Sequence, residues 1–258
     1  MTVYNNPQVS ICIPARYGAS RFPGKPLAKL AGKPLIQHVY EAAAHVTQVG
    51  QIMVLTDHDA IVQTVKGFGG EVCLVTDPCR TGTDRVAKVA AELTYEVVVN
   101  LQADEVLLHS DLLSDLIQPF LQAHAGIGTL KRKLHSREDR ENTSIVKVVT
   151  DQQGRALYFS RSAIPCWRDG IPEGVDPIAW MHLGIYIFRK PVLQQFSELA
   201  TGVLEEAEKL EQLRALEYGL PIMVWETVHE SLRIDTPEDL AVAESLLLAK
   251  SANVKRSF

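Results

Sequence analysis

Two patterns of apolar and polar residues alternate along the first half of the chain. Short apolar runs typical of buried strands alternate with stretches in which apolar residues recur at helical spacing. The runs predict strands at residues 9–14, 51–56, 71–76 and 96–101, and the spacing predicts helices at 34–46, 60–68, 82–93 and 110–124. Alternating strands and helices predict an α/β fold with a mainly parallel central sheet flanked by helices.

The second half of the chain is less regular. Two apolar segments flank the turn-forming sequence Asp-Gln-Gln-Gly and predict a hairpin. The remaining segments predict strands at 145–150, 155–159, 181–188 and 222–226, and helices at 191–199, 205–218 and 237–250. Two helix starts carry capping residues: Asp57 or Asp59 for the helix at 60–68, and Ser110 for the helix at 110–124.

Composition excludes several classes of protein. Apolar residues make up 46% of the 258 and charged residues 22%, which is typical of a globular chain and not of a disordered one. The net charge of −5 disfavours nucleic-acid binding, which needs a basic surface. No apolar run approaches the roughly 18 residues that span a bilayer, and the first residues do not resemble a signal peptide. We therefore expect a soluble cytoplasmic protein without membrane insertion.

The four cysteines contain no Cys-X-X-Cys pair. Zinc ligands usually occur as such close pairs, so we expect reduced thiols and no structural zinc.

The loop at residues 14–26 has the composition of a polyphosphate cradle. It follows a predicted strand and contains two arginines, one lysine and two glycines. Glycines let backbone N–H groups approach a phosphate, and fixed cations neutralise its charge. The loop is not a P-loop, because five residues separate Gly18 from Gly24 and because Pro26 stands where that motif has Ser or Thr. The alternative is a basic surface loop.

Two acidic segments could hold a divalent cation. Asp104 and Glu105 follow a very apolar predicted strand, where a carboxylate is held rigidly at the ligand-binding edge of a parallel sheet. Alternatively, both acids solvate a loop or cap the next helix. The segment from Asp235 to Asp239 fits a helix start, with Asp235 or Thr236 as the cap, and a capping residue can still be a metal ligand.

Three residues of the second half could recognise a polyhydroxylated acid. His182 and Tyr186 fall on one face of a predicted strand, and Arg161 ends another. Taken separately, each is better explained as a half-buried residue with a hydrogen-bond partner, and only their convergence would make such a site. The remaining histidines lack metal-binding spacing and fit surface or capping positions.

The sequence motifs of the chain resemble those of one protein family. The chain contains, in order, the motifs IPARYGASRFPGKPLAKLAGKPLIQHV, LTDH, GTDRV, VNLQADE, VKVV, ALYFSRSAIP, HLGIYIF, EKLEQLRALEYG and IDTPEDL. In this set and order it resembles the 3-deoxy-manno-octulosonate (Kdo) cytidylyltransferases over residues 9–247.

The resemblance implies a Rossmann-like nucleotidyltransferase fold in a single domain, 1–258. Residues 8–135 would bind CTP, and residues 136–250 would bind the sugar acid and carry a smaller mixed sheet used in dimerisation. The implied reaction is CTP + Kdo → CMP-Kdo + pyrophosphate, with Mg²⁺, in a cytoplasmic homodimer that serves lipopolysaccharide or other surface-glycan synthesis.

The resemblance also assigns residues by motif. The catalytic residues would be Arg16, Lys25, Asp104 and Asp235, of which Asp104 and Asp235 would hold the metal. The CTP-binding residues would be Ala15, Arg16, Lys25, Arg80, Gly82, Thr83, Gln102 and Asp104. The residues that bind the sugar acid would be Gln102, Arg161, His182, Tyr186, Glu211 and Gln212.

The chain departs from the family pattern at two places. Residues 102–106 read Gln-Ala-Asp-Glu-Val where the family usually has Gln-Gly-Asp-Glu-Pro, and residues 229–233 replace a stretch that is often rich in glycine. The segments RYGASRFPGKPLA, GFGG, EKLEQLRALEYG and ESLRIDTPED resemble a subgroup that includes enzymes acting on 8-amino-Kdo. The acceptor, Kdo, 8-amino-Kdo or another acid, therefore stays open, and so does a non-catalytic nucleotide-binding role.

Overall fold

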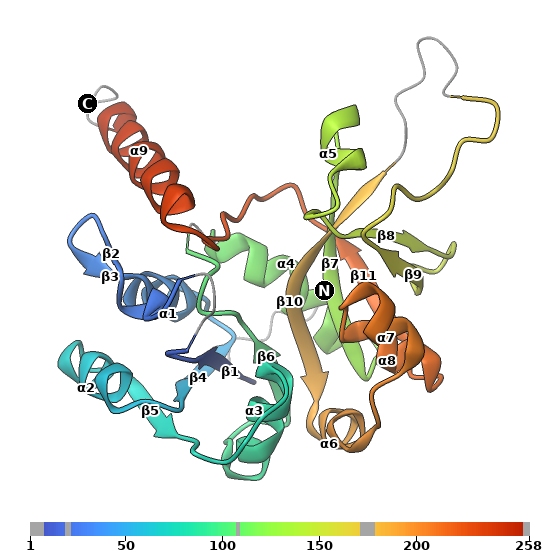
Figure 1. Cartoon of the computed structure of the whole chain (residues 1–258). Helices are drawn as coiled ribbons and strands as arrows, with labels where there is room; N and C mark the ends of the chain where they lie inside the picture. The colour runs from blue at the N-terminus through green and yellow to red at the C-terminus, as the bar shows by residue number, and fades with distance from the viewer. Residues whose placement is uncertain (1–7, 19–21, 107–108, 171–178, 255–258) are drawn as a thin grey trace. The chain divides into compact units, whose positions relative to one another are not determined.

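The structure is a computed structural model that describes residues 8–18, 22–106, 109–170 and 179–254, with the side chains of 247–254 left aside (Figure 1). The chain divides into two compact units. Unit 1 runs to Leu113 and resumes at Glu230, and unit 2 runs from Ser114 to His229. The first division falls inside helix α4 (Ser110–Gln122). Each unit is described by itself below.

Unit 1 contains a parallel sheet in the order β6-β1-β4-β5. Its strands are β6 (Val97–Asn100), β1 (Val9–Ala15), β4 (Val49–Thr56) and β5 (Glu71–Leu74). Every residue of β1 and β6 is buried, as expected for strands that lie inside a parallel sheet. The α/β class and the predicted strands are confirmed, and the carboxyl ends of β1 and β6 lie side by side.

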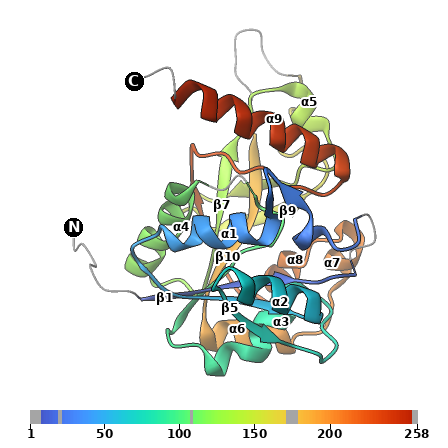
Figure 2. The ribbon, with the colours of Figure 1, turned by 90° about the vertical axis from the view of Figure 1, so that its left-hand side faces the viewer.

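Helices cover this sheet. They are α1 (Leu35–Ala44), α2 (Asp59–Gly67) and α3 (Gly82–Val89). Unit 1 also contains α9 (Pro237–Val254) and short helical turns at Lys25–Leu27 and Ala90–Glu92. Helix α1 packs on β1 and β4, and Figure 2 shows it running beside β1. A two-stranded hairpin, β2 (Lys29–Leu30) and β3 (Lys33–Pro34), precedes α1.

The predicted cap of α2 is wrong. The side chain of His58 caps this helix and accepts a hydrogen bond from the backbone N–H of Ala60 at 3.1 Å. Asp57 is engaged elsewhere: its carboxylate accepts from the backbone N–H of Tyr17 at 3.2 Å and from the guanidinium of Arg85 at 2.9 Å. Asp59 is already the first helical residue.

Unit 2 is built on a mixed sheet in the order β11-β7-β10-β8-β9. Its strands are β7 (Ile127–Lys133), β8 (Lys147–Thr150), β9 (Ala156–Ser160), β10 (Trp180–Arg189) and β11 (Ile222–Glu226). Among the described strands of this unit, β11 and β7 pair in parallel and the other pairs are antiparallel. This agrees with the smaller mixed sheet that the resemblance implied.

The helices of unit 2 include one correction. They are α5 (Arg137–Glu141), α6 (Lys190–Glu198), α7 (Val203–Glu208) and α8 (Gln212–Glu217). The single helix predicted at 205–218 is in fact α7 and α8, because Lys209 adopts a left-handed conformation with φ 54° and ends α7. Strand β7 and helix α5 were not predicted.

The structure also bears on the predictions about membrane insertion and about the cysteines. Among the described residues, no helix is both long and apolar enough to cross a membrane. The four cysteines are free, and burial raises the pKa of the Cys12 thiol to about 12.

Candidate functional site

Two cations and two carboxylates meet in unit 1. The ammonium of Lys25 lies 2.8 Å from Oδ2 of Asp104 and 3.3 Å from Oδ1 of Asp235. The guanidinium Nε of Arg233 lies 3.3 Å from the same Oδ2 of Asp104 and 3.5 Å from Oδ2 of Asp235. The three residues assigned by motif are thus brought together. Arg233 is a fourth member that the sequence analysis missed.

The backbone holds this cluster in place. Residues after β6 pair with residues before α9: Glu105 and Arg233 form an antiparallel bridge, and the N–H of Ile234 donates to the carbonyl of Asp104 at 2.9 Å. A second bond joins the N–H of Val106 to the carbonyl of Leu232 at 3.0 Å. Asp104 and Asp235 therefore come from one braced pair of segments.

The start of α9 settles which residue is the cap. The hydroxyl of Thr236 accepts from the N–H of Asp239, and the Asp239 carboxylate accepts from the N–H groups of Asp235 and Thr236, both at 2.9 Å. This reciprocal arrangement is a capping box. Thr236 is the cap, and the carboxylate of Asp235 is engaged by Lys25 and Arg233 instead.

The donor set fits a hard divalent cation. Asp104 is 8% exposed, and its Oδ1 has no hydrogen-bond partner among the described residues. A buried carboxylate oxygen without a partner is costly unless something positive approaches it. Carboxylate oxygens are the protein ligands that Mg²⁺ prefers. Asp104 and Asp235 could therefore hold Mg²⁺.

Glu105 is a second buried acid beside this pair. Burial and the charge of Asp104 raise its pKa to about 7, although Arg233 opposes the shift. For Arg233 itself, burial acts to lower the pKa, but the neighbouring carboxylates outweigh it and raise the pKa. The Glu105 side chain is 6% exposed and hydrogen-bonds with Ser231, and its Oε2, like Oδ1 of Asp104, has no hydrogen-bond partner among the described residues.

The loop after β1 supplies further candidates. Ala15 is the last residue of β1 and is buried. Arg16 is exposed, and no described residue pairs with its guanidinium. Gly24 has φ 70° and places Lys25 at the start of the next helical turn. The loop thus presents one cation to solvent and one to the carboxylates.

The residues assigned to the nucleotide lie at the ends of β1 and β6. Gly82 opens α3, and a Cβ added there would come within 3.0 Å of the Pro14 ring and 3.4 Å of the Gln102 amide oxygen. Arg80 donates from Nε to Asp84 at 2.9 Å and is half exposed. Gly82 therefore allows a close approach between α3 and the loop after β6.

Asn100 links two of these residues and was missed as a site residue. Its buried amide donates to the hydroxyl of Thr83 at 2.9 Å and accepts from the amide of Gln102 at 3.1 Å. The signal was visible in the sequence: a polar residue ends an otherwise apolar strand. Such a residue, when fully buried, needs partners, and here both partners are assigned to the nucleotide.

In unit 2, His182 and Tyr186 lie together as predicted. Their ring centroids are 5.4 Å apart, and both side chains are buried. Nε2 of His182 lies 3.0 Å from the hydroxyl of Thr129. Burial lowers the pKa of His182 to about 3, so the imidazole is neutral at pH 7. Burial and the charge of Glu211 raise the pKa of Tyr186 well above its usual value.

Three of the residues assigned to the sugar acid line one small cavity of about 10 Å³, which has room for about one water molecule. Tyr186, Glu211 and Gln212 share its wall with five apolar residues: Ile127, Phe188, Phe196, Ala215 and Ile222. His182 is in contact with Tyr186 behind this wall. Arg161 is not a lining residue of this cavity.

Arg161 is anchored close to the same helices. Its Nε donates to the carbonyl of Glu208 at 2.8 Å, and one terminal nitrogen donates to the carbonyl of Thr143 at 3.2 Å. Its backbone N–H donates to the Glu208 carboxylate at 2.9 Å. Glu208 ends α7, three positions before Glu211. A guanidinium has five N–H donors, so Arg161 retains donors for an anion.

A buried ion pair supports α7 and α8. Nε of Arg214 donates to Glu205 at 2.7 Å, and the guanidinium lies over the ring of Phe196 at 4.9 Å. The Arg214 side chain is 1% exposed. Phe196 is itself a lining residue of the cavity, so this pair supports its wall.

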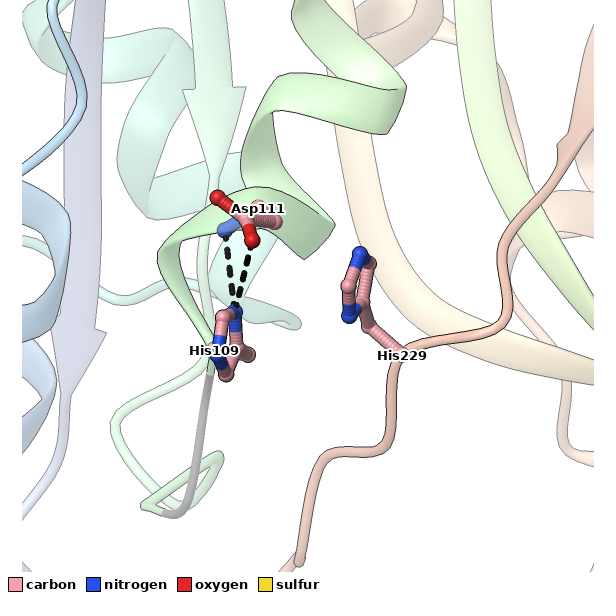
Figure 3. Close-up of side chains that lie close together, drawn as sticks. All are labelled: His109, Asp111 and His229. Carbon is pink, nitrogen blue, oxygen red and sulfur yellow. Dashed lines mark hydrogen bonds and ion pairs between the residues drawn. The ribbon is translucent and has the colours of Figure 1, made fainter.

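The histidines outside these clusters make local contacts. Figure 3 shows His109 beside Asp111: Nδ1 of His109 lies 3.3 Å from the Asp111 carboxylate and 3.4 Å from its N–H. His229, drawn with them, belongs to unit 2, where it lies 3.8 Å from Asp115. His109 occupies the capping position of α4 that was predicted for Ser110; that prediction is wrong, because Ser110 is already the first helical residue.

Comparisons with known proteins give consistent results. A family model described as cytidylyltransferase matches residues 10–246. A 3-deoxy-manno-octulosonate cytidylyltransferase of Anaeromyxobacter dehalogenans is 50% identical over 93% of this chain and 98% of its own. One from Geobacter sulfurreducens is 45% identical over 90% of this chain and 96% of its own.

Solved structures agree. CMP:2-keto-3-deoxy-manno-octonic acid synthetase, solved with CTP, superposes with a TM-score of 0.88 at 37% identity and covers 94% of this chain and 99% of its own. A putative glucose-1-phosphate thymidylyltransferase from Bacillus anthracis has a TM-score of 0.65 at 15% identity, over 92% of this chain and 94% of its own, and shows the shared fold alone.

Proposed function

The chain belongs to the cytidylyltransferase family, among the 3-deoxy-manno-octulosonate cytidylyltransferases, and on that premise we propose that it activates a 3-deoxy-octulosonic acid with CTP. The products are the CMP-sugar acid and pyrophosphate. The observation that carries this proposal is similarity over nearly the whole chain, combined with the acid–base cluster of Lys25, Asp104 and Asp235 in unit 1.

The reaction is difficult because a hydroxyl group, which is a weak nucleophile, must attack the negatively charged triphosphate of CTP. The anomeric hydroxyl of the acid attacks the α-phosphorus of CTP, and the bond from that phosphorus to the bridging oxygen of pyrophosphate breaks. Orientation of the reactants and neutralisation of charge are the principal ways to accelerate such a step. In this proposal both tasks fall to the loop after β1 and to the carboxylate pair.

The carboxylates of Asp104 and Asp235 would hold Mg²⁺, for which the unpartnered Oδ1 of Asp104 is the supporting observation. The bound ion supplies charge neutralisation and orientation at the phosphate oxygens. Lys25, already beside both carboxylates, would stabilise the charge that develops on pyrophosphate. Arg16 is exposed in the same loop and would bind the outer phosphates.

The nucleotide would lie against the ends of β1 and β6. Ala15 ends β1, and Gly82 leaves room beside Gln102 for a close backbone approach. Thr83 is oriented by its hydrogen bond with Asn100. Arg80, half exposed next to α3, would contact the nucleotide from the rim.

The acceptor would be bound by side chains of unit 2 outside the small cavity, whose volume of about 10 Å³ is too small for a sugar acid. Glu211 and Gln212 supply acceptors and donors for sugar hydroxyls, and Tyr186 stands beside them. The remaining N–H donors of Arg161 match a carboxylate. His182, held neutral by burial, orients Tyr186 and can exchange hydrogen bonds without carrying charge.

The proposal includes properties that the resemblance implied. These are a homodimer, a cytoplasmic location and a role in lipopolysaccharide or other surface-glycan synthesis. Light scattering of the purified protein tests the dimer directly, since a mass of one chain at micromolar concentration would contradict it.

The decisive experiment measures pyrophosphate release. CTP is offered with Kdo and with 8-amino-Kdo side by side, in the presence and absence of excess chelator. We expect turnover with at least one acid and loss of turnover on chelation. ATP, GTP and UTP serve as matched controls with the better acceptor. Absence of turnover with both acids would favour a different acid or a non-catalytic role, and full activity in chelator would overturn the Mg²⁺ assignment.

A further inference from the structure

The guanidinium of Arg233 lies beside both carboxylates of the cluster. Its Nε lies 3.3 Å from Asp104 and 3.5 Å from Asp235, the two residues proposed above as Mg²⁺ ligands. The inference that follows rests on that proposal. A guanidinium provides no lone pair to a metal and carries a permanent charge, so it cannot be a third ligand.

The position of Arg233 is built into the fold. Its backbone forms the antiparallel bridge with Glu105, and hydrogen bonds at Leu232 and Ile234 flank that bridge. These contacts place the Cα of Arg233 beside the residue that follows Asp104. The charged side chain is therefore attached to a braced segment and not to a free loop.

Lys25 and Arg233 differ in how freely their side chains can move away from the carboxylates. Both contact the same oxygen, Oδ2 of Asp104. The side chain of Lys25 is 13% exposed, whereas that of Arg233 is 55% exposed. Rotation into solvent is therefore open to Arg233 and restricted for Lys25. When a divalent ion approaches the carboxylates, Arg233 is the group that can withdraw.

We propose that Arg233 is a positioning residue that holds Asp104 and Asp235 together in the nucleotide-free protein and weakens their binding of a divalent cation until the nucleotide arrives. Before that, the metal must displace a cation that already neutralises the pair. A triphosphate brings negative charge that offsets the guanidinium, so the metal enters together with the nucleotide. Like charges at such distances repel strongly in a partly buried site.

The test measures binding of Mn²⁺ to the nucleotide-free protein by electron paramagnetic resonance, which reports the free ion. We expect Arg233→Met to bind Mn²⁺ at least about tenfold more tightly than the wild type, and Arg233→Lys, which keeps the charge, to resemble the wild type. The matched control is Lys88→Met. It removes one positive charge from unit 1 at a surface pair with Asp77, and it should leave the Mn²⁺ affinity unchanged.

Two outcomes overturn the inference. One is an affinity of Arg233→Met that equals the wild-type value or is weaker than it. The other is equal tightening by Lys88→Met, which would show an effect of net charge alone. A double variant, Arg233→Met with Asp104→Asn, separates this failure from that of the proposed function. If it binds Mn²⁺ as tightly as Arg233→Met alone, the metal-site assignment itself is wrong. Thermal unfolding of each variant confirms that it is folded.

Discussion

The ammonium of Lys25 lies 2.8 Å from the carboxylate of Asp104, although 79 positions separate the two residues in the sequence. Lys25 belongs to the loop that follows β1, and Asp104 to the segment that follows β6. These strands are parallel neighbours, so their carboxyl ends open at the same edge of the sheet. The phosphate-cradle loop and the acidic turn are therefore two parts of one site.

Replacement of either proposed metal ligand should abolish most activity. We expect Asp104→Asn and Asp235→Asn each to lower kcat at least about a hundredfold, because loss of a ligand removes about 3 kcal/mol or more of transition-state stabilisation. Pyrophosphate release measures this. Asp77→Asn, which changes an exposed surface acid of the same unit, is the control and should retain wild-type turnover. Near-normal turnover of either site variant would remove that residue from the metal site.

Arg161→Ala should change the KM for the sugar acid much more than the KM for CTP. If this residue binds the acid, its loss should raise KM for the sugar acid about 10- to 100-fold and leave KM for CTP nearly unchanged, since a charge-assisted hydrogen bond contributes about 1.5–3 kcal/mol. Because its guanidinium also holds the carbonyls of Glu208 and Thr143, we expect a lower melting temperature as well. If the melting temperature falls but the KM for the sugar acid does not change, Arg161 has a structural role and does not bind the acid.

His182 should make stability depend on pH in a defined direction. Its pKa is about 3 in the folded protein because burial opposes charging, and about 6.5 when it is exposed. Between these values the unfolded chain binds a proton that the folded chain does not. The stability contribution is therefore present above pH 6.5 and falls as the pH drops, by up to about 1.4 kcal/mol per pH unit.

His182→Gln lacks this titration and can still bond with Thr129. Denaturant unfolding at pH 7, 6 and 5 gives the free energy of unfolding of both proteins. The wild type should lose more stability than the variant as the pH falls. An identical pH dependence of the two would show that burial does not lower the pKa of His182.

The buried pair of Glu205 and Arg214 should be sensitive to removal of one partner. Glu205→Ala leaves a guanidinium that is 1% exposed without its carboxylate, and such a loss typically costs about 3–5 kcal/mol. Glu205→Leu with Arg214→Met should recover most of that stability, because apolar groups need no charge partner. Chemical denaturation measures both. Arg137→Ala breaks an exposed pair on α5 and should change stability by less than about 0.5 kcal/mol.

Asn100 should act through the residues that it orients. Asn100→Leu removes hydrogen bonds to Thr83 and Gln102 in a buried place, so we expect KM for CTP to rise and stability to fall by about 1–3 kcal/mol. Thr83→Val is the informative comparison, because it removes one bond and leaves the contact between Asn100 and Gln102. If Asn100→Leu lowers stability alone, with KM for CTP unchanged, Asn100 does not position the nucleotide site.

The sequence predicted unit 1 well for a physical reason. Strands buried on both faces are continuous apolar runs, so β1, β4 and β6 are visible without knowledge of their neighbours. The carboxyl-end rule then located the loop after β1 and the turn after β6. Lys25 and Asp104 could therefore be placed near one another before the structure was seen.

Strand β7 could not be predicted in the same way. Its central residues include Thr129 and Lys131, which are polar yet buried. Thr129 bonds to His182 and to two carbonyls of β10, and Lys131 lies over the ring of Trp180 at 4.4 Å and bonds to Thr150. These partners are distant in sequence, so the local pattern appears too polar for an inner strand.

Arg233 and the break at Lys209 escaped prediction for a related reason. A left-handed lysine gives no local signal, because that conformation normally favours glycine. Arg233 stands two positions before Asp235, but its contact with Asp104 depends on the pairing of residues 104–106 with 232–234. Such pairing is a property of the fold and not of either segment alone.

The division of the chain has a consequence for biosynthesis. Lys25 and Asp104 are translated before unit 2, and Asp235 and α9 after it. A chain emerging from the ribosome can thus form the sheet of unit 1 early, but the carboxylate pair is completed when the last part of the protein has been made. Domains tend to fold in the order of their synthesis. A nascent or prematurely ended chain can therefore carry a folded unit 1 sheet while lacking the means to bind metal, which delays activity until translation is complete.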